Sequence, residues 1–177
     1  MLEIAKSKTS NVNYIELSAA NMKFESNYFD YIVCNFAFHQ FEEKHLILDL
    51  ISMYLKESGI FKYKNICPEI MEKWWVYKYC PETYYEDLNR FWEKDLFVYE
   101  LEKRKFKTFV NIQYNENYRD IDTIIEDYKS RDNSQLSIIE DEYYKKGLQY
   151  LEILKNHSEK QIRNYFGLIE IVAEKFI

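Results

Sequence analysis

Hydrophobic and polar residues alternate with distinct periods along the first third of the chain. Residues 28–38 (YFDYIVCNFAF) are almost continuously apolar, which predicts a central strand of a parallel sheet, buried on both faces. Residues 42–56 have apolar positions at helical spacing, and Glu57-Ser58-Gly59 ends this predicted helix. Residues 60–66 (IFKYKNI) predict a second strand. A strand, a helix and a strand in this order predict a right-handed βαβ crossover.

The remaining segments continue this mixed α/β pattern. Before residue 28 we expect the end of a helix at 1–8 and a short strand through Val12, Tyr14, Ile15 and Leu17. After the second strand we expect an aromatic helical cap at about 68–105, broken at Pro81, and a strand at 106–114. A helical insertion at about 119–155, broken near 131–133, and a final strand at 164–176 complete the pattern. The sequence contains no linker, repeat or low-complexity tract, so we expect residues 1–177 to form a single domain.

Composition excludes several classes of function. The net charge is −6 without a Lys/Arg-rich block, which argues against a nucleic-acid partner. No apolar run approaches the roughly 20 residues of a membrane span, and the first residues lack the features of a signal peptide. The three cysteines have no paired spacing, so we expect no disulfide and no metal site. These features predict a cytoplasmic protein without a membrane partner.

Glycine is scarce. The chain has three glycines, Gly59, Gly147 and Gly167, where an average chain of this length has about twelve. No two of them are close enough to form a glycine-rich loop around a phosphate or a nucleotide.

One ordered set of short motifs resembles a known family. Three segments carry the resemblance: 18–24 (SAANMKF), 29–33 (FDYIV) and 38–41 (FHQF). In this order they are similar to the pattern D-A-x-x-L-P-F-x-x-x-x-F-D-x-V … L-H-H. That pattern is typical of class I S-adenosylmethionine (SAM) dependent methyltransferases, specifically the type 11-like domain. Residues 55–61 stand where that family has its L-K-x-G-G turn, and residues 1–6 resemble its helix after the second strand. Ser18 replaces the family's Asp, Lys23 its Pro, and Gln40 its second His.

The resemblance implies a fold and a cofactor. It predicts a partial Rossmann-like sheet, formed by strands 3 to 7 of the family order 3-2-1-4-5-7-6, with helical additions after strand 5 and between strands 6 and 7. The implied cofactor is SAM, with Ser18, Ala19 and Ala20 at the adenine end and Asn35, Phe36 and Ala37 at the cofactor floor. The alternatives are an ordinary turn for the first set and strand core for the second.

The same resemblance suggests an acceptor site. His39 follows the predicted strand and is a candidate general base, the alternative being a hydrogen-bonded structural histidine. The aromatic residues after the second strand are expected to cover a pocket for a small-molecule methyl acceptor, or else to form a helical core: Trp74, Trp75, Tyr77, Tyr84 and Trp92. The charged residues among them, including Asp87 and Arg90, are expected to form a solvated face.

The family's glycine-rich first loop and its first two strands have no counterpart in this sequence. The first predicted strand then has no partner, and the strand at 28–36 exposes an edge. The strand at 12–17 could move beside it, another copy could pair with the edge as a homodimer, or the natural chain could start further upstream, which is the interpretation we favour. Two functions are then possible. The first is a methyltransferase that is incomplete as given and binds SAM weakly or not at all. The alternative is a non-catalytic half-domain that serves in binding or oligomerisation.

Overall fold

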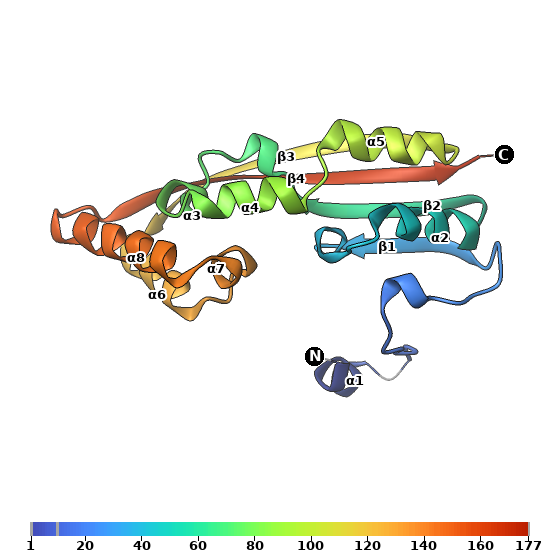
Figure 1. Cartoon of the computed structure of the whole chain (residues 1–177), viewed down its shortest axis with the longest axis horizontal. Coiled ribbons are helices and arrows are strands. Elements are labelled where there is room, and N and C mark those ends of the chain that lie inside the picture. The colour runs from blue at the N-terminus through green and yellow to red at the C-terminus, as the bar shows by residue number, and fades with distance from the viewer. Residues whose placement is uncertain (1, 10, 177) are drawn as a thin grey trace.

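The computed structural model describes residues 2–9 and 11–176 and has a four-stranded mixed sheet in these residues. The strands are β1 (Phe29–Asn35), β2 (Leu55–Ile66), β3 (Phe106–Asp120) and β4 (Gln161–Lys175). Their spatial order is β1-β2-β4-β3 (Figure 1). β1 is parallel to β2, whereas β4 is antiparallel to both of its neighbours.

Helices connect these strands and form two groups. Between β1 and β2 lies α2 (Lys44–Tyr54), which gives the predicted strand–helix–strand unit. The segment after β2 contains the short 3₁₀ helix η3 (Pro68–Ile70), α3 (Trp75–Tyr79), α4 (Glu82–Arg90) and α5 (Lys94–Lys103). Between β3 and β4 lie α6 (Ile121–Ser130), α7 (Ser134–Ile138) and α8 (Asp141–Asn156). The predicted α/β class, with helices in these two places, is confirmed.

β1 differs from its sequence prediction in its surroundings. The apolar run predicted a strand buried on both faces, but Tyr31 is 48% exposed and Val33 is 49% exposed. The prediction was wrong because β1 is an edge strand: in the described part of the chain it pairs with β2 alone. Its inner residues Phe29 and Ile32 pack against the core, while Tyr31 and Val33 remain about half exposed.

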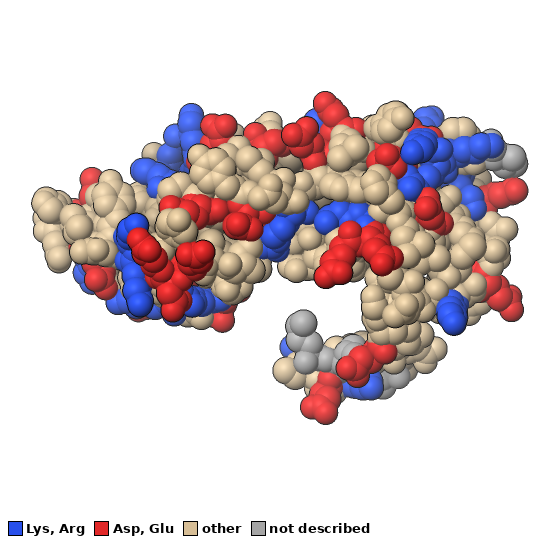
Figure 2. Space-filling model, viewed as in Figure 1, with Lys and Arg blue, Asp and Glu red and all other residues tan. Residues whose placement is uncertain are grey.

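The predicted strand at residues 12–17 is absent. Among the described residues before β1, regular structure is limited to α1 (Leu2–Lys8) and the 3₁₀ turn η1 (Ala19–Asn21). Val12 and Ile15 are exposed, and no strand lies beside them to supply hydrogen-bond partners. This segment also does not pair with the open edge of β1, and the arm that carries α1 stands away from the sheet (Figures 1 and 2).

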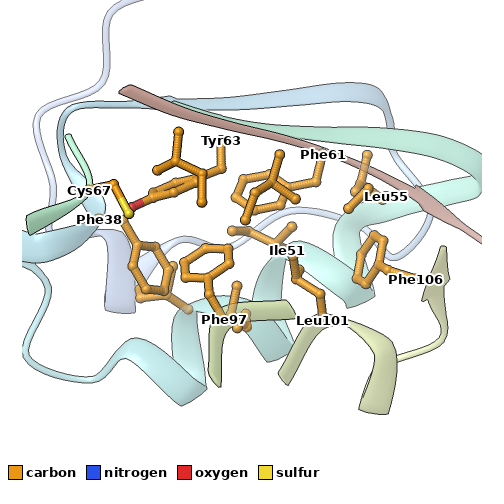
Figure 3. Close-up of a cluster of buried hydrophobic side chains, with 14 residues drawn as sticks. Phe38, Ile51, Leu55, Phe61, Tyr63, Cys67, Phe97, Leu101 and Phe106 are labelled. Carbon is orange, nitrogen blue, oxygen red and sulfur yellow. The ribbon is translucent and has the colours of Figure 1, made fainter. Parts of the chain in front are cut away.

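One core, which we call the main core, lies between one face of the sheet and the helices α2 and α5 (Figure 3). Phe61 of β2 and Ile171 of β4 are fully buried against Ile51 of α2 and Leu101 of α5. Burying each such side chain contributes about 1.5–3 kcal/mol to stability. The helical spacing of apolar residues in α2 therefore serves to cover the parallel pair β1–β2.

A second core joins the two helical groups. Its buried residues come from α3, α6 and α8 and from the beginning of β4: Trp75, Val76, Tyr79, Ile121, Ile124, Tyr128, Leu151 and Ile162 are among them. Figure 1 shows these helices gathered around the ends of β3 and β4 that extend beyond β2. Among the described residues, no helix combines the length and the apolarity that a membrane crossing requires.

Gly147 allows α8 to pack closely in this second core. A Cβ atom at this position would lie 2.6 Å from the backbone carbonyl oxygen of Tyr79 and would also meet the Tyr128 hydroxyl. A carbonyl oxygen within a helix cannot move away as a flexible side chain can. Replacing Gly147 by Ala should therefore lower the free energy of unfolding by about 2 kcal/mol, although alanine is the better helix former.

Urea denaturation of Gly147→Ala measures this loss. The matched control is Gln149→Ala, at an exposed position of the same helix, which should change stability by less than about 0.5 kcal/mol. A stabilised Gly147→Ala variant would show that helix propensity outweighs the close approach of α8 to α3.

Candidate functional site

The carboxyl ends of β1 and β2 lie at one edge of the sheet because the two strands are parallel. The chain leaves β1 through the 3₁₀ turn η2 (Phe38–Gln40), and the preceding turn η1 packs beside α2. Ser18 and Ala20 from the first turn and Gln40 from the second line the same hollow of about 310 Å³. Ligand pockets begin at about 300 Å³. The structure thus brings the two predicted exits of the chain together.

The rest of this hollow is polar at its rim. Phe41 and Ile47 supply apolar contacts, whereas Glu42 and Glu43 supply carboxylates. Ala19 does not line the hollow but packs against the main core together with Ala20. This space, which we call the smaller hollow, therefore offers a partly acidic recess next to the beginning of α2.

Phe36 belongs to a different cavity. It directly follows β1, and its backbone N–H donates to the Lys64 carbonyl oxygen at 2.8 Å. Its φ is 51°, in the left-handed region that bulky residues rarely adopt. Such strain costs on the order of 1–3 kcal/mol and is concentrated at ligand sites. Asn35 is exposed at the end of β1, and Ala37 is half-buried beside it.

The cavity around Phe36 has a volume of about 510 Å³. Its floor is one face of β4, where Asn164, Phe166 and Leu168 point to the same side. The other lining residues come from the end of β2, the segment after it, the end of β3, and α6 with the loop that follows: Ile66, Met71, Trp74, Trp75, Arg119, Asp127, Ser130, Asp132 and Asn133. We call this space the aromatic cavity.

The predicted acceptor-pocket residues separate into three environments. Trp74 and Trp75 line the aromatic cavity. Tyr77 is buried and packs against the ring of Tyr84 at 5.1 Å. Trp92 lies elsewhere, at 5.5 Å from the ring of Phe38 beside the main core. The structure therefore brings two of the five predicted residues to one cavity.

Asp87 and Arg90 do not form the solvated face that the sequence suggested. Asp87 is 0% exposed and accepts a hydrogen bond of 2.7 Å from the Tyr77 hydroxyl. Its Oδ1 lies 3.6 Å from Nη1 of Arg90, so the two form a buried ion pair. Burial raises the pKa of Asp87. The prediction failed because the polar spacing of a helix does not show that another helix, here α7, covers its charged side.

His39 is buried with a side-chain amide beside each of its two ring nitrogens. Nδ2 of Asn65 donates to Nδ1 of His39 at 3.1 Å, and the Asn65 side-chain oxygen accepts from the Ile66 N–H, which fixes the amide. The ring hydrogen is then on Nε2, which lies 2.8 Å from the amide nitrogen Nε2 of Gln40. Exchanging the nitrogen and oxygen positions of the Gln40 amide would let its oxygen accept this hydrogen. The ring also stacks on Phe91 at 4.3 Å.

Burial, together with the nearby charges of Arg90 and Lys44, lowers the pKa of His39 to about 4. The imidazole is therefore neutral at pH 7. The arrangement joins the turn after β1 to the end of β2.

This burial predicts how stability depends on pH. The pKa of His39 is about 4 in the folded protein and about 6.5 when unfolded, so the unfolded state binds more protons between these values. The free energy of unfolding should fall as pH drops from 6.5 to 4. His39→Gln removes the titration and should lessen this fall by about 2–3 kcal/mol.

Urea unfolding of both proteins at several pH values tests this expectation. The comparison uses the slope against pH, since His39→Gln also loses the stacking on Phe91 at every pH. His157→Gln, at an exposed histidine, is the control for the same substitution outside the core. Equal slopes for wild type and His39→Gln would contradict a buried neutral imidazole.

Residues 1–62 match the family model of the methyltransferase domain. These residues include both turns at the smaller hollow and the β1–α2–β2 unit up to Lys62. No curated protein gave a match.

Several crystal structures are similar to the whole fold. A Bacillus halodurans protein provisionally described as a methyltransferase has 18% identity, a TM-score of 0.62, and coverage of 99% of this chain and 77% of that one. The Bacillus subtilis YcgJ protein has 17% identity, a TM-score of 0.60, and coverage of 99% and 76%. Haemonchus contortus phosphoethanolamine N-methyltransferase 2, solved with SAM, has 14% identity, a TM-score of 0.52, and coverage of 99% and 40%.

The resemblance to a methyltransferase domain is therefore confirmed in sequence over residues 1–62, and the fold of almost the whole chain is similar to that of these crystal structures. The low identities establish the fold and leave the reaction to be argued from the site.

Proposed function

We propose that the protein takes part in SAM-dependent methyl transfer to a small-molecule acceptor. The observation that carries this proposal is the single hollow shared by Ser18, Ala20 and Gln40, which come from the two turns that resemble the family's adenine-side segments. Ser18, Ala19 and Ala20 would hold the adenine end of the cofactor. Residues 35–37 would form its floor and separate it from the acceptor in the aromatic cavity.

The residues present fit one end of SAM. The smaller hollow has the volume and the polar rim that a nucleobase needs. The three glycines, however, lie within β2, α8 and β4, and none of them forms a loop in front of a helix. The described residues therefore supply one wall of a cofactor site and no loop for the methionine part.

Methyl transfer from a sulfonium is an in-line displacement that depends mainly on positioning and on exclusion of water. Aromatic faces also favour a cationic sulfonium centre. The rings of Phe36, Trp74 and Trp75 suit this role. In this proposal His39 positions the turn after β1 and does not act as a base, because both of its ring nitrogens face amide partners.

Calorimetric titration with SAM and with S-adenosylhomocysteine tests the cofactor assignment. We expect the 177-residue chain to bind with a Kd above the low micromolar range, because one wall cannot enclose the ligand. Ser18→Asp restores the carboxylate that the resemblance leads us to expect. A charge-assisted hydrogen bond to the adenine amine should then tighten binding about ten-fold.

Ser26→Asp adds the same charge in the exposed segment before β1 and should leave the affinity unchanged. A low micromolar Kd for the wild type would contradict the single-wall interpretation. Equal affinities of folded Ser18→Asp and wild type would contradict the adenine placement.

A second candidate function is a non-catalytic module that associates through β1. Its support is the outer edge of β1, which is without a strand partner among the described residues and presents Tyr31, Val33 and Phe36, each about half exposed. Unpaired apolar edges readily form additional backbone pairs. In this alternative, two copies would pair their β1 strands.

Analytical ultracentrifugation over a range of concentrations tests this association. If the β1 edges pair, Val33→Lys should shift the dimer to monomer, because charged side chains on an edge strand oppose pairing. Val110→Lys places the same charge on β3, at the opposite edge of the sheet, and should leave the dimer intact. Monomeric wild-type protein at every concentration would exclude this candidate.

A further inference from the structure

The aromatic cavity contains a buried acceptor without a donor. Asn164, on β4, is 6% exposed and lines the cavity. Its Nδ2 donates to Oδ1 of Asn117 on β3 at 3.0 Å, while its own Oδ1 is buried and has no hydrogen-bond partner among the described residues. Buried side-chain oxygens are almost always satisfied, and an unsatisfied one destabilises the fold. This oxygen therefore indicates that a ligand supplies a donor.

Most other polar groups around the cavity already have partners. Arg119 donates to Asp127 at 2.6 Å, so their charges offset each other. The Ser130 hydroxyl donates to the Asp127 carbonyl oxygen, and the Asn133 side chain accepts from the Gln135 N–H.

Asp132 differs from these groups. It is exposed at the rim, and the structure records no ion pair for its carboxylate among the described residues. The acidic and basic side chains that line the cavity therefore leave one net negative charge.

Aromatic rings provide the remaining walls. Trp74 and Trp75 come from the segment after β2, Phe166 lies on the floor, and Phe36 enters from the end of β1. Ring faces attract cations, with tryptophan the most effective of the aromatic side chains. The cavity thus combines the free oxygen of Asn164, the carboxylate of Asp132 and several aromatic rings. These groups are complementary to a ligand group that is cationic and donates hydrogen bonds.

We infer that the aromatic cavity binds a small protonated amine, whose N–H donates to Oδ1 of Asn164 and whose charge faces Asp132. A neutral alcohol could satisfy the oxygen but would gain nothing from the carboxylate. An anion would be repelled by Asp132 and could not satisfy the oxygen. Binding of the protonated amine requires no cofactor. The inference rests on the proposed function only in assigning the amine as the methyl acceptor, a step in which the amine first releases a proton to solvent so that its nitrogen lone pair can attack the methyl group.

Three probes of similar shape separate these chemistries: 2-phenylethylamine, 2-phenylethanol and phenylacetate. Calorimetric titration of the full chain at pH 7 without SAM should give a Kd for the amine at least ten-fold lower than for the alcohol. Phenylacetate should not bind measurably. Quenching of tryptophan fluorescence should accompany amine binding because two of the chain's three tryptophans line the cavity.

Variants test the two polar contacts separately. Asp132→Asn, at an exposed position, should weaken amine binding about three-fold and reduce its salt dependence. Asn164→Val should weaken it about ten-fold, whereas Asn164→Asp, which keeps an acceptor, should bind the amine at least as well as wild type. Glu126→Gln, an exposed acid on α6 outside the cavity, is the charge control and should have no effect.

Equal affinities for the amine and the alcohol, or unchanged amine binding in Asp132→Asn, would overturn the inference even if Asn164→Val fails to fold. Amine binding is measured without SAM, so its outcome is independent of the cofactor titration. Selective amine binding in a protein that fails to bind SAM would support the cavity assignment and count against the proposed methyl transfer.

Discussion

The pairing of β4 with two different strands is the constraint on which the rest of the structure depends. β4 forms an antiparallel ladder with β2 from Leu168 to Glu174 and another with β3 along its whole length. Its C-terminal half buries Ile169, Ile171 and Ala173 in the main core, whereas Ile162 near its beginning lies in the second core. A strand formed by the last residues of the chain therefore joins both cores.

The unequal lengths of the strands create the aromatic cavity. β2 ends at Ile66, opposite Leu168, while β3 and β4 continue as a two-stranded ribbon to Asp120 and Gln161. A two-stranded ribbon alone is marginally stable in water. Here α6 packs against both strands and α3 packs against β4. The face of β4 just beyond Ile66 then lies between α6 with its following loop and the segment that carries Trp74 and Trp75, and this is where the cavity forms.

The sequence predicted what depends on local patterns. Helical spacing in residues 42–56 predicted a helix, and the apolar run that contains β1 predicted a strand. Both predictions succeeded because hydrophobic periodicity follows backbone geometry. Burial on both faces of β1 could not be predicted from that run, since it depends on neighbouring strands. The absent strand at 12–17 has the same cause: a strand needs a partner, and its residues alone do not supply one.

The sequence indicated only those residues of the candidate site that belong to local motifs, because contacts between distant segments leave no local pattern. Ser18 and Gln40 were placed by motifs with defined spacing, and they do line one hollow. Asn164 carries no motif at all, and the significance of its oxygen depends on Asn117, which is 47 residues away. Asp87 was misassigned because polar residues in a helix are usually solvated, and burial by another helix is a tertiary effect.

The two hollows depend on a single short turn. Phe36 enters the aromatic cavity, while Gln40 and Phe41 line the smaller hollow. The segment between them is fixed at its centre, where Phe38 is buried in the main core and His39 is hydrogen-bonded to Asn65 of β2. The left-handed backbone at Phe36 bends the chain, so that Phe36 faces the aromatic cavity while Gln40 and Phe41 face the smaller hollow. Because β2 holds both Phe36, through Lys64, and His39, through Asn65, the register of the β1–β2 pair sets the relative placement of the two hollows.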